Sequence, residues 1–326
     1  MGNVSFRLDG SVAGSGTLSS GVATFATSSL THGSHTYCRG GYRPFMESEK
    51  QHRNVEAPNW MYRLGESRAM FELGAFAASA PWLRMLGRGD RHPVLVLPGF
   101  TASDTSTTPI RFTLRSQGYW AHGWNLGPNV GPTDRIFDGI HERLAQISER
   151  HDRKVSIVGW SLGGIYAREL ARNNPELIRQ IITLGSPFRM TLADRSTVSK
   201  LADALTPAWS EEVIRLASEE FDKPPLTVPS TAIYSRSDGI VRWHMCIDQV
   251  TENHENIEVR GSHSGLGFNP AVMYAITDRL NQPENDWRPF RAPITARHFF
   301  PKPASWAEQV KRERHGSRPH VVRQTA

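Results

Sequence analysis

Cysteine is nearly absent from this sequence, because only Cys38 and Cys246 occur among its 326 residues. They lie far apart and neither has a second thiol nearby, so they can build neither a disulfide framework nor a cysteine-based zinc site. Uncharged apolar runs near the ~18 residues that a membrane-spanning helix needs are also missing, and the mean hydropathy is −0.44. The sequence therefore predicts free thiols and a soluble chain without a membrane span.

The beginning of the chain lacks the basic start and apolar run of a secretory signal, which favours a cytoplasmic location. Residues 4–8, 22–26 and 35–37 alternate in polarity between stretches of Gly and Ser, a pattern that predicts a β-meander. This stretch resembles part of a bacterial immunoglobulin-like repeat, but such sandwiches need about 100 residues. We interpret residues 1–45 as a truncated or fused β-rich fragment without its own function, or as a strand pair added to the main domain.

Acidic residues are scarce at the C-terminal end, and the net charge of +6 arises there. From Arg288 onward nine Lys or Arg accompany two Glu, while the rest of the chain is close to neutral. A basic tail can bind polyanions, but a solvated end rich in Pro and Arg accounts for the same composition. We therefore expect residues 291–326 to form a basic tail and predict no nucleic-acid partner.

From about residue 90 the chain alternates strand-like and helix-like segments, which predicts a mostly parallel sheet with helices on both faces. Residues 93–97, PVLVL, form the unbroken apolar run that a strand buried on both faces requires. Further strands are expected at residues 119–123, 155–158, 180–184, 231–235 and 256–260, and helices at 61–87 with a break at Pro81, 109–118, 133–151, 162–173 and 270–280. The sequence therefore predicts the α/β class.

One G-x-S-x-G motif, running from Gly159 to Gly163, follows an expected strand and precedes an expected helix. In this context Ser161 lies on a sharp turn, and glycine on either side removes Cβ atoms that would collide there. The N-terminus of the following helix favours negative charge beside Ser161. These features predict that Ser161 is a nucleophile.

The segment VSIVGWSLGGIYARELA resembles the nucleophile elbow of the α/β-hydrolase superfamily, on its bacterial lipase and carboxylesterase side. The resemblance covers about residues 90–290 and implies an α/β-hydrolase fold for a domain at residues 46–290. It also implies an acid and a general base on loops after later strands, in the chain order Ser, Asp or Glu, His.

The acid of this arrangement is expected at Asp238, which directly follows the strand predicted at residues 231–235. Asp-Gly is also a common ordinary turn, and Asp248, Glu252 and Glu255 are the alternative acids. The strand immediately before it favours Asp238.

The general base is expected at His263, on the Gly-rich loop GSHSGLG between a predicted strand and the closing helix. His244 and His254 are the nearest competitors, but both precede the strand predicted at residues 256–260. A loop histidine bonded only to backbone is the other interpretation. In the favoured assignment, neutral His263 takes the proton of Ser161 and returns it to the leaving group, while Asp238 orients the imidazole.

Two backbone N–H groups are needed to stabilise the tetrahedral oxyanion. Leu162, the residue after the nucleophile, supplies one, and the resemblance assigns the other to Phe100, just past the first buried strand. The histidine usual in this loop is Pro98 here, and the HGGG pattern of esterases is absent. A loop with one glycine and a bulky residue resembles enzymes that accept medium or longer acyl chains.

An insertion is expected at about residues 189–228, because the connection there is too long for one plain loop and helix. The resemblance implies that it is a short helical lid over the acyl pocket, although static core accounts for the same apolar side.

The favoured interpretation is a serine carboxylic-ester hydrolase acting through an acyl-enzyme on a small-molecule, lipid or polyester ester, with no cofactor and no metal site. The alternatives are an acyltransferase with the same triad, and a non-catalytic binding protein on a hydrolase scaffold.

Overall fold

The protein is described from a computed structural model, which describes residues 58, 60–83, 86, 89–189, 223 and 225–305 together with the backbone of residues 3–8 and 11–17. The chain divides into two units, Met1–Arg53 and Asn54–Ala326. We call the second the C-terminal unit.

The first unit contains an antiparallel strand pair, β1 (Asn3–Leu8) and β2 (Ser11–Thr17). The sequence predicts the first of these strands but a Gly/Ser turn in place of β2, and that part of the prediction is wrong. Glycine lowers strand propensity, but cross-strand pairing with β1 outweighs so weak a preference. The strands predicted at residues 22–26 and 35–37 lie outside the described residues.

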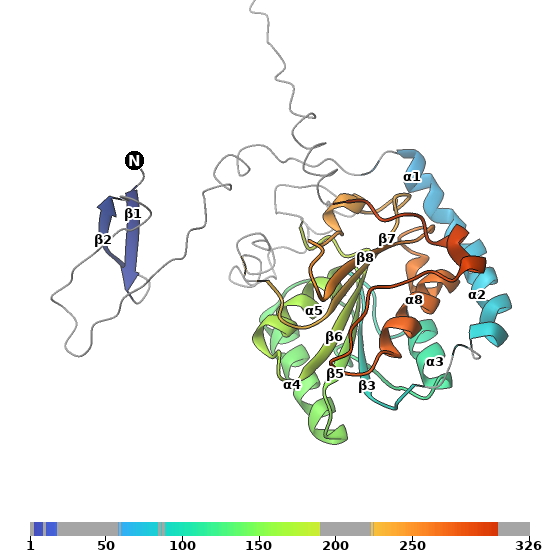
Figure 1. Cartoon of the computed structure of the whole chain (residues 1–326), viewed down its shortest axis with the longest axis horizontal. Helices are drawn as coiled ribbons and strands as arrows, with labels where there is room; N and C mark the ends of the chain where they lie inside the picture. The colour runs from blue at the N-terminus through green and yellow to red at the C-terminus, as the bar shows by residue number, and fades with distance from the viewer. Residues whose placement is uncertain are drawn as a thin grey trace, which may run out of the picture. The chain divides into compact units, whose positions relative to one another are not determined.

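The C-terminal unit is built on a parallel sheet with the strand order β4-β3-β5-β6-β7-β8 (Figure 1). Its strands are β3 (Pro93–Leu97), β4 (Trp120–Gly123), β5 (Val155–Trp160), β6 (Ile178–Leu184), β7 (Ser230–Tyr234) and β8 (His254–Glu258). All neighbouring strands of this sheet run parallel, which confirms the predicted sheet. β8 starts and ends two residues earlier than predicted, because pairing with β7 begins at His254.

Helices cover both faces of this sheet (Figure 1). They are α1 (Trp60–Gly65), α2 (Ala69–Leu83), α3 (Thr108–Ser116), α4 (Asp134–His151), α5 (Leu162–Asn173) and α8 (Pro270–Leu280). A 3₁₀ turn at Glu66–Arg68 joins α1 to α2. The break predicted at Pro81 is wrong, because α2 continues past it for two residues, to Leu83.

Strand β3 shows why the sequence contains the run PVLVL. Val94 and Val96 belong to a buried cluster with residues of α3 and α8, whereas Leu95 and Leu97 belong to another with residues of α4 and α5. Successive side chains of a strand point to opposite faces, so a strand covered on both sides needs apolar residues throughout.

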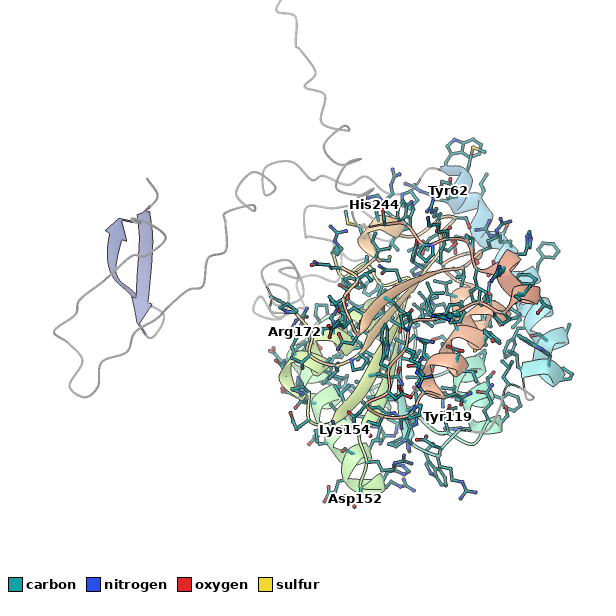
Figure 2. The ribbon with its side chains drawn as sticks, viewed as in Figure 1. Tyr62, Tyr119, Asp152, Lys154, Arg172 and His244 are labelled. Carbon is teal, nitrogen blue, oxygen red and sulfur yellow. The ribbon has the colours of Figure 1, made fainter. Side chains whose placement is uncertain are left out.

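The direction of the strands determines where loops meet. Lys154, which precedes β5, lies at the opposite end of the C-terminal unit from His244 and from Tyr62 of α1 (Figure 2). Because the carboxyl ends of parallel strands lie at the same end of the sheet, the loops after β3, β5, β6, β7 and β8 gather at the end near His244 and Tyr62.

Part of the predicted tail packs onto the C-terminal unit. The rings of Phe290 and Phe300 are 4.9 Å apart, and the backbone N–H of Ala304 donates to the hydroxyl of Tyr234 at 2.7 Å. Most of the lid predicted at residues 189–228 lies outside the described residues. No described helix combines the length and apolar composition needed to cross a membrane.

Candidate active site

Ser161 occupies the turn between β5 and α5 with backbone angles of φ +53° and ψ −120°. A positive φ is unfavourable for a residue with a Cβ and persists only where surrounding contacts hold it. Close packing around the turn provides those contacts. A Cβ at Gly159 would lie 2.4 Å from the carbonyl oxygen of Gly163, and one at Gly163 would lie 2.5 Å from that of Leu97. Only glycine fits at these two positions.

The two backbone positions predicted to bind the oxyanion lie on segments that border Ser161. Leu162 is the first residue of α5 and follows Ser161 directly. Phe100 follows Gly99 in the loop after β3, where a Cβ on Gly99 would lie 3.2 Å from the Cβ of Ser161. The structure therefore brings the loop of Phe100 beside the turn of Ser161 and Leu162.

The side chain of Asn129 holds the loop after β3, and sequence reasoning missed it. Asn129 is fully buried and donates from Nδ2 to the carbonyl of Pro98 at 2.9 Å. Its Oδ1 accepts from the backbone N–H of Gly131 and the hydroxyl of Tyr166. The backbone carbonyl of Asn129 also accepts from the N–H of Thr101 at 2.7 Å. No local motif announces this role, because Asn129 lies in an irregular loop 31 residues from its partner Pro98.

Asp238 and His263 meet from two different loops, those that follow β7 and β8. Nδ1 of His263 lies 2.5 Å from Oδ2 of Asp238, and both residues are buried. The other carboxylate oxygen of Asp238 accepts from the backbone N–H groups of Ile240 and Val241, each at 2.8 Å. Burial by itself would lower the pKa of His263, but the charge and hydrogen bond of Asp238 raise that pKa above its usual value.

Gly185, the residue after β6, lies against this pair. Its φ of +52° falls in the left-handed region, and a Cβ there would lie 3.1 Å from Nδ1 of His263 and 3.3 Å from Oδ2 of Asp238. Trp160, which precedes Ser161, donates from Nε1 to the carbonyl of His263 at 3.2 Å. Among the described residues, no hydrogen bond joins Ser161 Oγ to the imidazole of His263.

The alternative acids have other partners or lie at the surface. Asp248 forms an ion pair with Arg168 and Glu255 forms one with Arg279, each with an N to O distance of 2.6 Å. Glu252 is exposed. These positions leave Asp238 as the candidate acid that contacts the imidazole of His263.

The two alternative bases, His244 and His254, lie outside the loop of His263. His254 is the first residue of β8, at the end of the strand opposite to the loop of His263. His244 belongs to a 3₁₀ turn at Trp243–Met245. Within the described part of the chain, no group of three or more His, Cys, Asp or Glu side chains is arranged to hold a metal ion.

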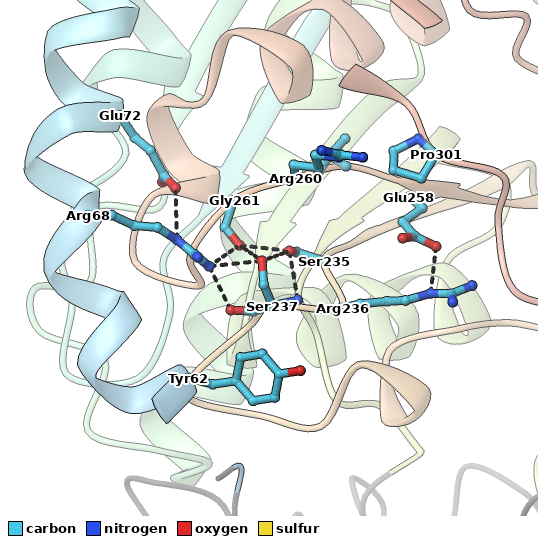
Figure 3. Close-up of a pocket in the computed structure, with 11 residues that line it drawn as sticks. Tyr62, Arg68, Glu72, Ser235, Arg236, Ser237, Glu258, Arg260, Gly261 and Pro301 are labelled. Atoms are coloured by element: carbon cyan, nitrogen blue, oxygen red, sulfur yellow. Dashed lines mark hydrogen bonds and ion pairs between the residues drawn. The ribbon is translucent and has the colours of Figure 1, made fainter. Parts of the chain in front are cut away.

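A pocket of ≈ 510 Å³ lies where the loops after β7 and β8, which carry Asp238 and His263, meet α1 and α2 (Figure 3). It contains neither of these residues nor Ser161, and its lining consists of Tyr62, Arg68, Glu72, Ser235, Arg236, Ser237, Glu258, Val259, Arg260, Gly261 and Pro301. Residues of α1 and α2 therefore line the same pocket as residues of both loops.

Comparison with known families gives a match to the PGAP1-like alpha/beta domain over residues 134–259. That range begins at α4 and includes Ser161 and Asp238. A curated relative, the pimeloyl-[acyl-carrier protein] methyl ester esterase of Shewanella woodyi, is 28% identical over 36% of this chain and 45% of its own length. The serine hydrolase BPHL of Mus musculus is 27% identical over 39% of this chain and 46% of its own length. The chain is thus similar to an alpha/beta domain family and to two hydrolases. It spans just under half the length of these two relatives.

Solved structures similar to this chain include two lipases. Lipase B of Aspergillus fumigatus has a TM-score of 0.45 and 20% identity, covering 61% of this chain and 55% of its own. The Bacillus licheniformis lipase BlEst2 has the same TM-score and 15% identity, covering 60% of this chain and 94% of its own.

Proposed function

We propose that this protein cleaves carboxylic esters through an acyl-enzyme formed on Ser161. The observations that support the proposal are the positive φ of Ser161 in the turn after β5 and the buried pair of Asp238 and His263 on loops at the same end of the sheet. The names of the two curated relatives, an ester esterase and a serine hydrolase, support an ester as the substrate.

The proposed reaction begins with His263 neutral and its Nδ1–H donated to Asp238, which leaves Nε2 to accept the proton of Ser161. Ser161 Oγ then forms a bond to the ester carbonyl carbon, and the N–H groups of Leu162 and Phe100 stabilise the resulting oxyanion. The bond to the alcohol breaks as His263 gives it the proton. Water, deprotonated by His263, releases the acid and restores Ser161.

The proposal requires the Ser161 hydroxyl to turn toward His263 when substrate binds. Catalytic hydrogen bonds are often long or poorly aligned without substrate and tighten in the complex. The contact of Trp160 Nε1 with the carbonyl of His263 supports this, because it keeps the two segments adjacent.

The proposed substrates are esters with medium or longer acyl chains, including lipids and polyesters. This part rests on the loop Pro98–Gly99–Phe100, in which a single glycine precedes a bulky, half-buried phenylalanine. Phe100 follows Gly99, which borders Ser161, and would supply an apolar wall to an acyl chain.

The test is hydrolysis of p-nitrophenyl esters from acetate to palmitate by the full chain and by Ser161→Ala. Ser148→Ala is the matched control, because Ser148 lies near the end of α4 and its hydroxyl bonds only to the carbonyl of Arg153. We expect turnover in the wild type and the control and none in Ser161→Ala. A fluorophosphonate probe should label Ser161, as identified by mass spectrometry of the labelled peptide.

Turnover or labelling that survives the loss of Ser161 would overturn the proposal. Product analysis with an added alcohol or amine separates hydrolysis from acyl transfer, because a transferase would convert the acceptor into a new ester or amide. The absence of both turnover and labelling at every chain length would favour a binding protein on this scaffold.

A further inference from the structure

The N-terminal helices make charged contacts with the loops of Asp238 and His263. Glu66, in the 3₁₀ turn between α1 and α2, accepts at Oε1 from the backbone N–H of Gly239 at 2.8 Å and of His263 at 2.9 Å. Its Oε2 accepts from the backbone N–H of Ser264 at 2.9 Å. One carboxylate therefore joins the residue after Asp238 to His263 itself.

The fit between Glu66 and these loops is close. A Cβ at Gly239 would lie 2.3 Å from the backbone carbonyl oxygen of Tyr62 and 2.9 Å from Cγ of Glu66. The φ of Gly239 is not positive, so its backbone conformation does not require glycine. Glycine is needed at this position because the helix approaches so closely. The Asp-Gly pair, for which an ordinary turn was the alternative interpretation, thus also packs against α1.

Glu66 is negatively charged at neutral pH. Its partial burial would raise the pKa of the carboxyl, but hydrogen bonds from the backbone of Ser264, His263 and Gly239 lower that pKa below its usual value. Glu72 of α2 is the other acid near Glu66 on these helices. Its carboxylate accepts from the backbone N–H and the hydroxyl of Ser262.

The remaining charge in this contact comes from Arg68. Its Nη2 donates to the carbonyl and hydroxyl of Ser237 and to the carbonyl of Gly261 (Figure 3). Arg68 and Glu72 thus hold the loops from the pocket side. Besides Asp238, Glu66 is the acid whose charge acts on the imidazole of His263, and it favours the protonated form.

We propose that Glu66 is a positioning residue that fixes His263 against Asp238 and supplies a second negative charge to the imidazolium formed during the reaction. This inference rests on the proposed function, in which His263 is the general base. It assigns a role in the catalytic cycle to Glu66, which lies outside residues 134–259, the range that the family matches.

The experiment compares Glu66→Gln and Glu66→Ala with the wild type in the full chain. Gln retains one oxygen that can accept from Gly239 and His263, but it loses the charge and turns an NH₂ group toward the N–H of Ser264. Glu142→Gln is the matched control, because Glu142 is exposed on α4. Thermal unfolding establishes which variants are folded, and Glu66→Gln decides the question should Glu66→Ala fail to fold.

We expect Glu66→Ala to lower kcat by about 10- to 100-fold with little change in KM, because a small displacement of a catalytic group slows the chemical step. Glu66→Gln should lower kcat by a smaller factor. In both variants the midpoint of the pH–rate profile should move to lower pH, because a negative charge near His263 is gone. A merely structural residue would leave this midpoint in place.

NMR titration of the His263 ring, assigned with His263→Gln, gives a readout that needs no turnover. We expect the ring to titrate at lower pH in Glu66→Gln than in the wild type, whether or not the ester substrates are turned over. An unchanged titration midpoint together with unchanged kcat would overturn the role of Glu66. If Glu66→Gln shows this shift but the wild type neither hydrolyses esters nor reacts with the fluorophosphonate, the proposed function is overturned and the contact of Glu66 with His263 is not.

Discussion

Nδ1 of His263 lies 2.5 Å from Oδ2 of Asp238, and the carboxylate is held by two backbone N–H groups on its other oxygen. The carboxylate cannot turn away without leaving those donors unpaired in a buried site. Asp238 therefore fixes both the orientation of the imidazole and the nitrogen that carries its proton.

Replacing Asp238 with Asn should lower kcat by about 10³- to 10⁴-fold while KM changes little. An amide can present its NH₂ group to Nδ1, which would favour the tautomer with the proton on Nε2 and block acceptance from Ser161. Steady-state kinetics with the best p-nitrophenyl ester measure the effect. Glu252→Gln, at the exposed alternative acid, should retain wild-type kcat; a large loss there would contradict the assignment of Asp238.

The activity should depend on pH through His263. Burial lowers the pKa of this group, but Asp238 and Glu66 outweigh burial, so the pKa lies above its usual value of 6.5. Because the base must be neutral, kcat/KM should be high above that pKa and fall as the pH drops through it. The measurement is a profile of kcat/KM from pH 5 to 9. A midpoint below 6.5 would contradict the charge arrangement described above.

Gly163→Ala should destabilise the protein by about 1–3 kcal/mol, because the new methyl group would meet the backbone of Leu97 and Pro98. Gly74→Ala is the matched control. Gly74 lies within α2 with open space around it, so alanine there should stabilise by about 0.5–1 kcal/mol. Denaturant unfolding gives both values, and equal effects at the two sites would show that the turn around Ser161 is not tightly packed.

Asn129→Ala should cost about 1–3 kcal/mol of stability, because it leaves the buried carbonyl of Pro98 without its donor. It should also lower kcat more than it changes KM, since the loop of Phe100 would lose its support. Tyr166→Phe removes only the 3.3 Å bond to the same amide and should have a smaller effect on both quantities. Unchanged kcat in a folded Asn129→Ala variant would separate this loop from oxyanion binding.

Much of the fold could be predicted from local patterns. The apolar run of residues 93–97 and the helical spacing in α4, α5 and α8 gave their bounds almost to the residue, because each signal lies within one element. The errors among the strands occurred where strand pairing decided the outcome. Neighbouring strands fixed β2 and the two-residue displacement of β8.

For the candidate site, the sequence alone determined that a serine lies between a strand and a helix and that an aspartate and a histidine lie on loops that follow later strands. These are local facts about residue order. Only the tertiary structure decided that Asp238 contacts His263, that Asn129 holds the loop after β3, and that Glu66 binds the backbone of His263 from 197 positions away. Such contacts depend on where the chain folds back on itself, and no periodicity or short motif encodes the meeting of an N-terminal helix with two distant loops.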